Sequence, residues 1–439
     1  MINLAIGRLD LPDEQGWLAL SGSGVMAGLV GMEYDFRPGQ EEHTQENISL
    51  RLSGSRPQLE AWTGRLEACQ LQIEDLYLRL WSQQRQEFGY AKIHQLSVGV
   101  QPKHLESHEK GSLELTLKLT RETLFFSAEQ PIPLSNSSMP RVVNGLVLYN
   151  HDDAAFGHDN WFRVDANELN LEYPPLTRFQ FDNTYNGKEL GDFWIGGLTS
   201  RLGEPPPKAT YEAEAGSGGT VINHNQASGG KYCRYQWSGA GWHTLTSWTL
   251  GAIEVSQFSG STVLPFVRFF NPPASSSIQL RLLIDLQGKR VFEGPVTQIA
   301  PGKGIVGLDR LHLPLGELPL KSAAIPHQLI LQAKQNEDGE HLLQIDDLLL
   351  LPQQRFVGYH FLSGLETSMS LVEDENTGKS WSLDDDLEFK SHTRIGTGLG
   401  LQPKLPQYFW CFQSDTDGQA PIDRTLRVRG WYRRQWRLP

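Results

Sequence analysis

The amino-acid sequence predicts a mainly β protein: a β-sandwich domain with one helix, a second β-sandwich of the jelly-roll type and a C-terminal β segment. Three observations predict this class. The chain of 439 residues is rich in the turn-forming residues glycine (43) and proline (25). Apolar residues recur with a period of two along many short stretches. Only one stretch of useful length has the period of a helix.

The clearest strand is predicted over residues 113–119, where four leucines alternate with polar residues. The helix is predicted to begin at Ser55, because Pro57 suits a first turn and Gln58 stands at the spacing of a capping box. Apolar residues then follow three and four positions apart, as one face of a helix requires. They are Leu59, Trp62, Leu66, Cys69 and Ile73.

A change in composition divides the sequence into three predicted segments. Residues 1–202 form an N-terminal β domain with the helix, residues 203–354 a second β-sandwich, and residues 355–439 the C-terminal β segment. The spacer Gly-Glu-Pro-Pro-Pro-Lys at residues 203–208 marks the first boundary, because consecutive prolines favour an extended chain. The two ends of a sandwich would lie close together. We therefore expect the middle segment to be an insertion and the C-terminal segment to pack with the first.

Charge and cysteine content argue against several functional classes. The net charge of −12 disfavours specific nucleic-acid recognition, which needs a basic surface. Cys69, Cys233 and Cys411 lack the spacing of a zinc site or a disulfide framework. No apolar run approaches about 18 residues, and the first residues lack the pattern of a secretion signal. We expect no membrane insertion, and a protein that is made and assembled in a cytoplasm.

The sequence shows no motif for catalysis, which predicts a protein that is not an enzyme and has no catalytic residues. The GxSxG, Walker and HExxH patterns are all missing. The adjacent carboxylates of Asp346 and Asp347 leave a glycosidase-type site as an alternative. Two groups also leave a metal site as an alternative: His104 with His108, and His151, Asp152 and Asp153 with His158 and Asp159. Both stretches are more typical of polar loops and turns.

Three short motifs stand in the middle segment: Tyr-Glu-Ala-Glu at 211–214, Ala-Ser-Gly-Gly-Lys-Tyr at 227–232 and Gln-Ile-Asp-Asp-Leu-Leu at 344–349. In this order they resemble the calcium-containing β-sandwich carbohydrate-binding modules of the galactose-binding-like group. In that family the opening Glu-Ala-Glu motif and an aspartate of the last strand bind a structural calcium ion.

The resemblance implies Glu212, Glu214 and Asp346 as calcium ligands, with Asp347 in place of Asp346 if the register shifts by one residue. Calcium suits such a set because it takes several oxygen ligands.

Aromatic side chains of the same segment are candidates for stacking on a sugar ring, as such modules do. The candidates are Tyr232, Tyr235, Trp237 and Trp242. Trp242 lies in a predicted glycine-rich loop and is expected to be exposed. Trp237 and Trp248 lie in strand-like patterns and are better interpreted as core residues.

The flanking segments have their own succession of motifs. A helix with Pro-x-Leu-x-x-Trp at 57–62 precedes a strand at 76–80, Tyr-Pro-Pro-Leu-Thr-Arg at 173–178 and a final strand with Tyr-Arg-Arg at 432–434. This layout resembles tail proteins of long-tailed bacteriophages in the neighbourhood of the distal tail protein family. That family has an N-terminal β domain that forms rings, and some members carry an inserted carbohydrate-binding module. The family's usual N-terminal signature is not evident, which leaves the position along the tail open.

The C-terminal strand is basic although the protein is acidic, and arginine and tryptophan are enriched at interface hot spots. We expect it to contact an acidic loop at residues 384–386 of a sister subunit. A solvated strand with surface arginines is the alternative. The predicted inter-subunit residues are Arg427, Arg429, Arg433 and Trp436.

The function predicted from the sequence is therefore a structural component of a phage tail tip or baseplate. Its predicted partners are copies of itself in a hexameric or trimeric ring, other tail proteins, and host-surface polysaccharide. The predicted location is the tail of a virion, which also explains a carbohydrate-binding module without a secretion signal. The alternatives are a soluble non-catalytic glycan-binding protein and a carbohydrate-active enzyme with an accessory module.

Overall fold

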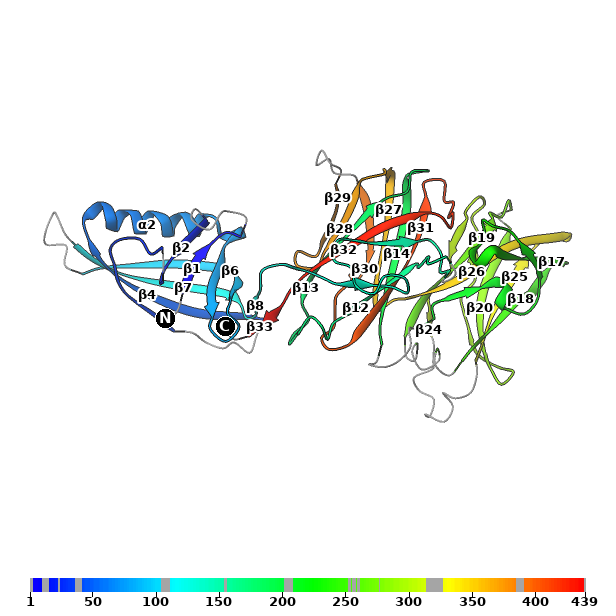
Figure 1. Cartoon of the computed structure of the whole chain (residues 1–439), viewed down its shortest axis with the longest axis horizontal. Coiled ribbons are helices and arrows are strands. Elements are labelled where there is room, and N and C mark those ends of the chain that lie inside the picture. The colour runs from blue at the N-terminus through cyan, green and yellow to red at the C-terminus, as the bar shows by residue number, and fades with distance from the viewer. Residues whose placement is uncertain are drawn as a thin grey trace. The chain divides into compact units, whose positions relative to one another are not determined.

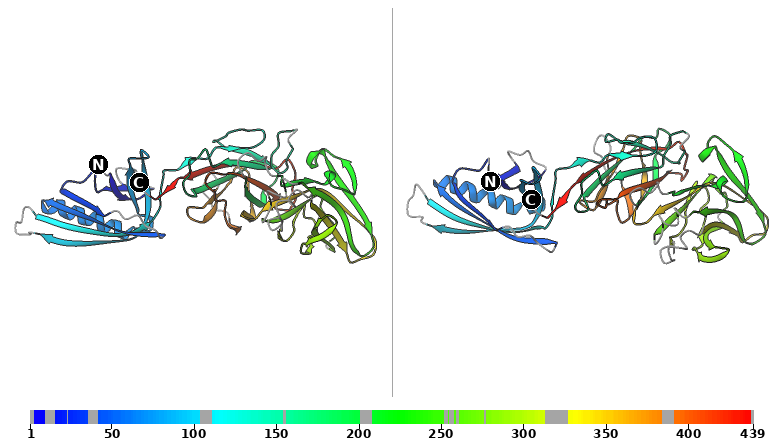
Figure 2. Two further views of the ribbon diagram at one scale, coloured as in Figure 1. Left: turned by 90° about the horizontal axis from the view of Figure 1, so that it is seen from below. Right: turned by 60° about the horizontal axis from the view of Figure 1, so that its bottom comes forward.

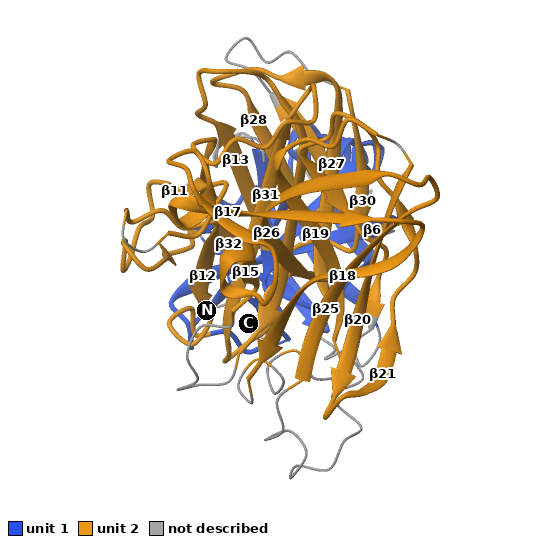
Figure 3. Cartoon of the chain, turned by 90° about the vertical axis from the view of Figure 1, so that its right-hand side faces the viewer, with its two compact units in different colours: residues 1–130, 171–176, 433–439 blue, residues 131–170, 177–432 orange. Residues whose placement is uncertain are grey.

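The computed structural model describes residues 3–9, 16–22, 24–35, 42–103, 111–153, 156–200, 208–251, 254, 258, 261–275, 277–312, 327–383 and 391–437. These residues are mostly β-strand, as Figure 1 shows, which confirms the predicted fold class. They form two compact units, coloured separately in Figure 3. Unit 1 contains residues 1–130, 171–176 and 433–439, and unit 2 contains residues 131–170 and 177–432.

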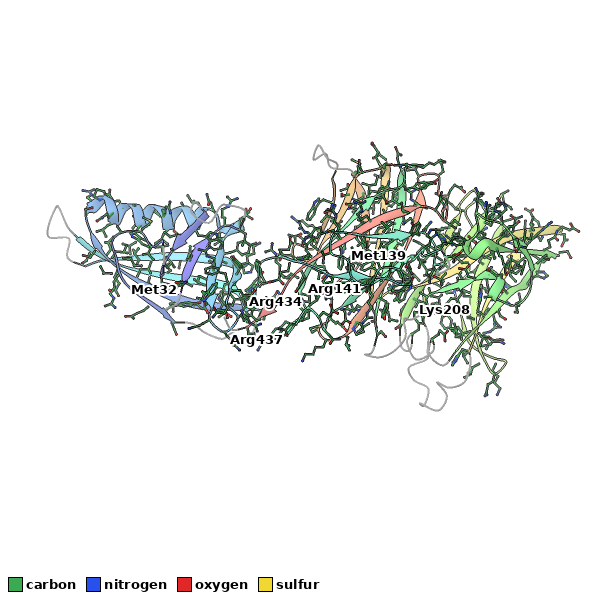
Figure 4. The ribbon with its side chains drawn as sticks, in the orientation of Figure 1. Met32, Met139, Arg141, Lys208, Arg434 and Arg437 are labelled. Carbon is green, nitrogen blue, oxygen red and sulfur yellow. The ribbon has the colours of Figure 1, made fainter. Side chains whose placement is uncertain are left out.

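Unit 1 is built on one curled antiparallel sheet. Its strands run in the order β2 (Trp17–Ala19), β1 (Leu4–Gly7), β5 (Tyr77–Ser82), β6 (Glu87–Lys103), β7 (Gly111–Glu122), β4 (His43–Gly54) and β3 (Leu29–Asp35). Two short strands complete it, β8 (Phe125–Phe126) on β6 and β33 (Gln435–Trp436) on β8. The side chain of Arg434, which Figure 4 labels beside the C-terminal strand, donates to both carboxylate oxygens of Glu87 at 3.1 and 2.9 Å.

Helix α2 (Arg56–Leu71) lies along this sheet, as both views in Figure 2 show, and 3-10 helix η1 (Ile73–Asp75) follows it. The predicted capping box is present, because the backbone N–H of Ser55 donates to Oε1 of Gln58 at 2.9 Å. The predicted apolar stripe is also present. Leu59, Trp62 and Leu66 are buried in the core of unit 1, and Cys69 and Ile73 pack against it.

Unit 2 begins with a pair of six-stranded sheets. The first runs β10 (Leu134–Ser135), β12 (Trp161–Asp165), β31 (Pro406–Asp415), β14 (Leu190–Thr199), β27 (Arg355–Leu365) and β30 (His392–Gly396). The second runs β11 (Leu146–Tyr149), β32 (Thr425–Arg433), β13 (Leu176–Asn183), β28 (Ser370–Asp374) and β29 (Lys379–Leu383), with β9 (Gln130–Pro131) on β32. Phe162 and Phe409 of the first sheet contact Phe179 of the second, which makes an aromatic core between the sheets.

A second pair of sheets in unit 2 is formed by residues 210–352. One contains β16 (Thr220–Asn223), β17 (Lys231–Ser238), β26 (Glu340–Pro352), β19 (Thr262–Asn271) and β23 (Ile305–Gly307), with β15 (Thr210–Glu212) and β24 (Leu311–His312) alongside. The other contains β18 (Gly241–Leu250), β25 (His327–Gln335), β20 (Ile278–Leu286), β21 (Lys289–Glu293) and β22 (Thr297–Gln298). Short 3-10 turns η2 (Ala213–Ala215) and η3 (Ser228–Gly230) follow β15 and precede β17. Both sheets contribute to one core.

The second sandwich is inserted between two neighbouring strands of the first. Strand β14 pairs directly with β27, and the chain between them builds the second sandwich. The predicted N-terminal segment is also divided differently from expectation. Its strands β10 to β14 share sheets with strands of residues 355–432 instead of with the helix-bearing sheet, whereas residues 171–176 belong to unit 1. The local pattern of apolar residues does not reveal this division, because each sheet contains strands from distant parts of the chain.

Gly64 offers a direct test of the helix in unit 1. It is exposed in α2, and apart from its chain neighbours and the nearby backbone of the helix itself, no atom lies within 4 Å of the position that a Cβ would take. Glycine destabilises a helix interior by roughly 0.5–1 kcal/mol relative to alanine. Gly64→Ala should therefore raise the free energy of unfolding of unit 1 by about that amount, measured by hydrogen exchange of α2. Ala61→Gly, at an exposed position of the same helix, should have the opposite effect.

Candidate functional site

A cluster of buried charges lies in the sheet of the second sandwich that contains β15, β19 and β26. Arg268 of β19 and Glu212 of β15 both lie opposite Asp347 of β26, one on each side. The Arg268 guanidinium forms an ion pair with Asp347, and its Nε lies 3.2 Å from Oδ2 of Asp346. Its Nη1 also donates to the backbone carbonyl of Asn150 at 2.5 Å. Arg268 therefore ties the second sandwich to a loop of the first within unit 2.

The carboxylates in this cluster outnumber the guanidinium. Burial raises the pKa of Glu212, and the neighbouring Asp347 raises it further. Burial also raises the pKa of Asp346, to about 7, and that of Asp347. Burial lowers the pKa of Arg268, but the carboxylates of Asp347 and Asp346 raise it more, so that the net shift is upward. Arg268 therefore stays cationic at neutral pH, and burial favours the protonated form of each carboxyl.

The predicted calcium ligands take different positions around this cluster. Oε1 of Glu212 accepts a hydrogen bond from the Ser228 hydroxyl at 2.7 Å, and the Ser228 N–H donates to Oδ1 of Asp346 at 2.9 Å. Oε2 of Glu212, Oε2 of Glu214 and Oδ1 of Asp347 are buried without a hydrogen-bond partner. The described residues contain no group of three or more such side chains placed to hold a metal ion. The cation that contacts the carboxylates of Asp346 and Asp347 in this structure is the Arg268 guanidinium. Calcium binding stays a prediction.

The structure buries three of the four candidate sugar-stacking residues. Tyr235 and Trp237 belong to the core, and Tyr232 is stacked on Phe270 with ring centroids 4.1 Å apart. Their rings therefore present no open face to a sugar. Trp242 is half-buried and lies in strand β18 rather than in the predicted loop, and the Arg281 guanidinium lies 4.0 Å from the centroid of its ring.

The predicted inter-subunit residues of the C-terminal strand also differ among themselves. Trp436 is 1% exposed and belongs to the core of unit 1, so in this structure it is not accessible to a second subunit. Arg429 donates to both carboxylate oxygens of Asp182, at 3.0 and 2.9 Å. Arg433 is half-buried and Arg427 is exposed. The acidic loop at residues 384–386, their expected counterpart, lies outside the described residues, as do His104 and His108.

The second histidine group is a hydrogen-bonded cluster. Nδ1 of His158 lies 3.1 Å from Nε2 of His151, and Nδ1 of His151 lies 2.8 Å from the Ile422 carbonyl oxygen. Burial, and then the positive charge of Arg268, lowers the pKa of His151 to about 4. Asp159 is buried and accepts a hydrogen bond from the Ser137 hydroxyl at 2.6 Å. His151, Asp153 and His158 of this group line one side of a groove.

That groove in unit 2 consists of two adjoining cavities of about 580 and 420 Å³, which share Asn225, Ile422 and Asp423. It lies where described residues of three connecting segments meet: residues 150–153 and 156–160 before β12, 224–230 before β17 and 416–424 before β32. This groove could not be predicted from the sequence, because its residues come from segments far apart in the chain. The one sequence signal was the polar cluster around His151.

Comparisons with known proteins leave the chain without an assigned family. No protein-family model matches the sequence, and no curated protein matches it. Among solved structures, a chain of the structure of infectious bursal disease virus Gx strain matches this chain with a TM-score of 0.19 at 8% identity, over 61% of this chain and 67% of that chain. The phage P2 baseplate in its activated conformation with Ca has a TM-score of 0.22 at 9% identity, over 94% of this chain and 99% of that chain.

A putative secreted protein from Parabacteroides distasonis has a TM-score of 0.17 at 9% identity, over 55% of this chain and 99% of that chain. TM-scores this low carry no argument about relationship or role. Within the described residues, no helix has both the length and the apolar character of a membrane span.

Proposed function

We propose that the protein is a structural subunit of a phage-type tail tip or baseplate, and that unit 1 assembles with further copies of itself and with other tail proteins. The layout of motifs that resembles the distal tail protein family supports this function. Calcium and host-surface polysaccharide stay predicted ligands of unit 2. The alternative of a glycan-binding protein without a tail role predicts a monomer that binds polysaccharide.

The observation that carries the proposal is the open edge of the sheet in unit 1. Strand β3 ends the sheet, and the described residues place no strand on its outer side. Val30, at a register shift near the start of β3, is 68% exposed. An exposed edge strand favours pairing with another chain unless something covers it. In a symmetric oligomer a sister subunit can cover this edge strand, either with its own copy of the same edge or with a complementary edge.

The test is the mass of the purified full-length chain by light scattering, with negative-stain images. We expect a closed oligomer. Val30→Glu should shift it towards monomer, because a charge on the edge opposes strand pairing. The matched control is Val291→Glu on edge strand β21 of unit 2, where the valine is 43% exposed; it should leave the mass unchanged. A wild-type chain that stays monomeric at every concentration, or an oligomer indifferent to Val30→Glu, would overturn the proposal.

A further inference from the structure

The groove in unit 2 has the composition of a small-molecule site. Its larger cavity is lined by imidazoles, carboxylates and amides around one exposed aromatic ring, Phe156, which is 73% exposed. Besides His151, the polar residues that line this cavity are Asp153, His158, Asn223, His224, Asn225 and Asp423. An exposed ring among convergent polar groups is typical of ligand-binding sites. Nothing within the described residues buries this ring.

Its first wall is held in a fixed arrangement of donors and acceptors. The Ile422 carbonyl can only accept, so Nδ1 of His151 carries the proton and Nε2 accepts from Nδ1–H of His158. In its neutral form His158 is then left with Nε2 as an acceptor. Stacking on Tyr149, with ring centroids 3.8 Å apart, holds the His158 ring in place. This wall therefore presents acceptors, from His158 and from the carboxylate of Asp153.

The second wall has the complementary arrangement. Nδ1 of His224 accepts a hydrogen bond from the backbone N–H of Gln226 at 3.2 Å, which leaves Nε2 as the donor of the neutral ring. The His224 ring lies edge-on to Phe270 at 4.6 Å. The side-chain amides of Asn223 and Asn225 add both donors and acceptors on this wall.

Donors and acceptors that line one cavity suit hydroxyl groups, because each hydroxyl both donates and accepts. The carboxylates of Asp153 and Asp423 disfavour an anionic ligand, and the Arg268 charge is already engaged by Asp346 and Asp347. An apolar ring face beside such groups matches the alternating polar rim and apolar face of a pyranose. We infer that this groove binds a neutral saccharide, with the sugar stacked on Phe156 and its hydroxyls shared between the two histidine walls.

The experiment is titration of the full-length chain with neutral oligosaccharides of glucose, galactose and N-acetylglucosamine, followed by saturation-transfer NMR and calorimetry. We expect binding of at least one of them and none of polygalacturonate. Phe156→Ala should weaken the binding at least tenfold. The matched control is Leu362→Ala, since Leu362 is 72% exposed on β27 of the same unit. His224→Ala, from the opposite wall, should also weaken binding and provides a second variant if Phe156→Ala folds poorly.

Two outcomes would overturn the inference. One is the absence of binding to every neutral saccharide at millimolar concentration. The other is binding that survives both groove substitutions and is lost in Trp242→Ala, because the site would then lie on β18. The inference rests on the prediction that unit 2 binds a polysaccharide and assigns that ligand to a site, and it fails separately from the proposed assembly. A monomer that binds sugar through Phe156 would contradict the proposed ring of subunits and support the saccharide site. An oligomer that binds no sugar would support the assembly and contradict the saccharide site.

Discussion

Arg268→Met is expected to lower the free energy of unfolding of unit 2 by about 3–5 kcal/mol at neutral pH, because removing one partner of a buried ion pair leaves an uncompensated buried charge. The Arg268 side chain is 1% exposed, and those of Asp346 and Asp347 are 3% and 0% exposed. Without the guanidinium these carboxyls must be protonated in the folded chain. Protonation of an aspartate at pH 7, about three units above its ordinary pKa, costs about 4 kcal/mol.

The same reasoning predicts how the loss depends on pH. A carboxyl whose folded pKa is raised stabilises the fold most at acidic pH, and that stabilisation is lost as the pH rises through its folded pKa. Burial raises the pKa of Asp346 to about 7 even with Arg268 in place. The deficit of Arg268→Met should therefore shrink as the pH falls from 7 towards about 4, the ordinary carboxyl range.

The measurement is hydrogen exchange of peptides from β19 and β26, which reports local stability without assuming that both units unfold together. The control is Arg290→Met, which removes a partly exposed ion pair with Asp285 in the same unit and should cost less than about 1 kcal/mol. A deficit that is equal at pH 4 and pH 7 would show that the loss comes from packing and not from charge.

The sequence predicted what depends on local pattern. The capping box at Ser55 and the stripe of Leu59, Trp62 and Leu66 specify α2 because a helix is defined by neighbours three and four residues apart. The alternating leucines of residues 113–119 likewise specify part of β7. The partners of these strands were not predictable in the same way. Strand β14 is paired with β27 and β31, and the apolar and aromatic patterns of these strands do not indicate which strand lies beside which.

The candidate site shows the same division. Glu212 and Asp347 lie in the motifs at 211–214 and 344–349, and the structure makes them neighbours because β15 pairs with β26. Their role as calcium ligands stays a prediction. The arginine that faces them was missed, although a charged residue within the apolar stretch of β19 is itself a signal for a buried partner. Burial also decided the aromatic candidates. Tryptophan is a residue type that is common at binding sites, but Trp237 and Trp436 are core residues. Their burial can be predicted only once the opposing strands are known.

Arg121→Met should have an effect of similar size in unit 1, about 3–5 kcal/mol. Nε and Nη2 of Arg121 donate to the two carboxylate oxygens of Glu46 at 2.9 and 2.7 Å, and the Tyr34 hydroxyl donates to the same carboxylate at 2.6 Å. The Arg121 and Glu46 side chains are 1% and 0% exposed. Burial, and then the charge of Glu46, raises the pKa of Tyr34, so the tyrosine stays a neutral donor and cannot replace the lost cation.

Hydrogen exchange of β4 and β7 measures this loss, and two variants interpret it. Arg51→Met removes an exposed pair with Glu33 on the same sheet and should cost less than about 1 kcal/mol. Removing both members of the buried pair, Arg121→Met with Glu46→Leu, should recover most of the stability, because no buried charge is then left unpaired. A double variant as unstable as Arg121→Met alone would contradict this explanation.

The triad also connects stability to assembly. Tyr34 belongs to β3, whereas Glu46 and Arg121 belong to β4 and β7, so the carboxylate holds the open edge strand against the rest of the sheet. If β3 forms the contact between subunits, Arg121→Met should dissociate the oligomer under conditions in which α2 remains protected from exchange. The double variant restores stability but not the hydrogen bond from Tyr34, and it should therefore recover the oligomer only in part. An oligomer that withstands Arg121→Met while β3 exchanges freely would place the subunit contact elsewhere in the chain.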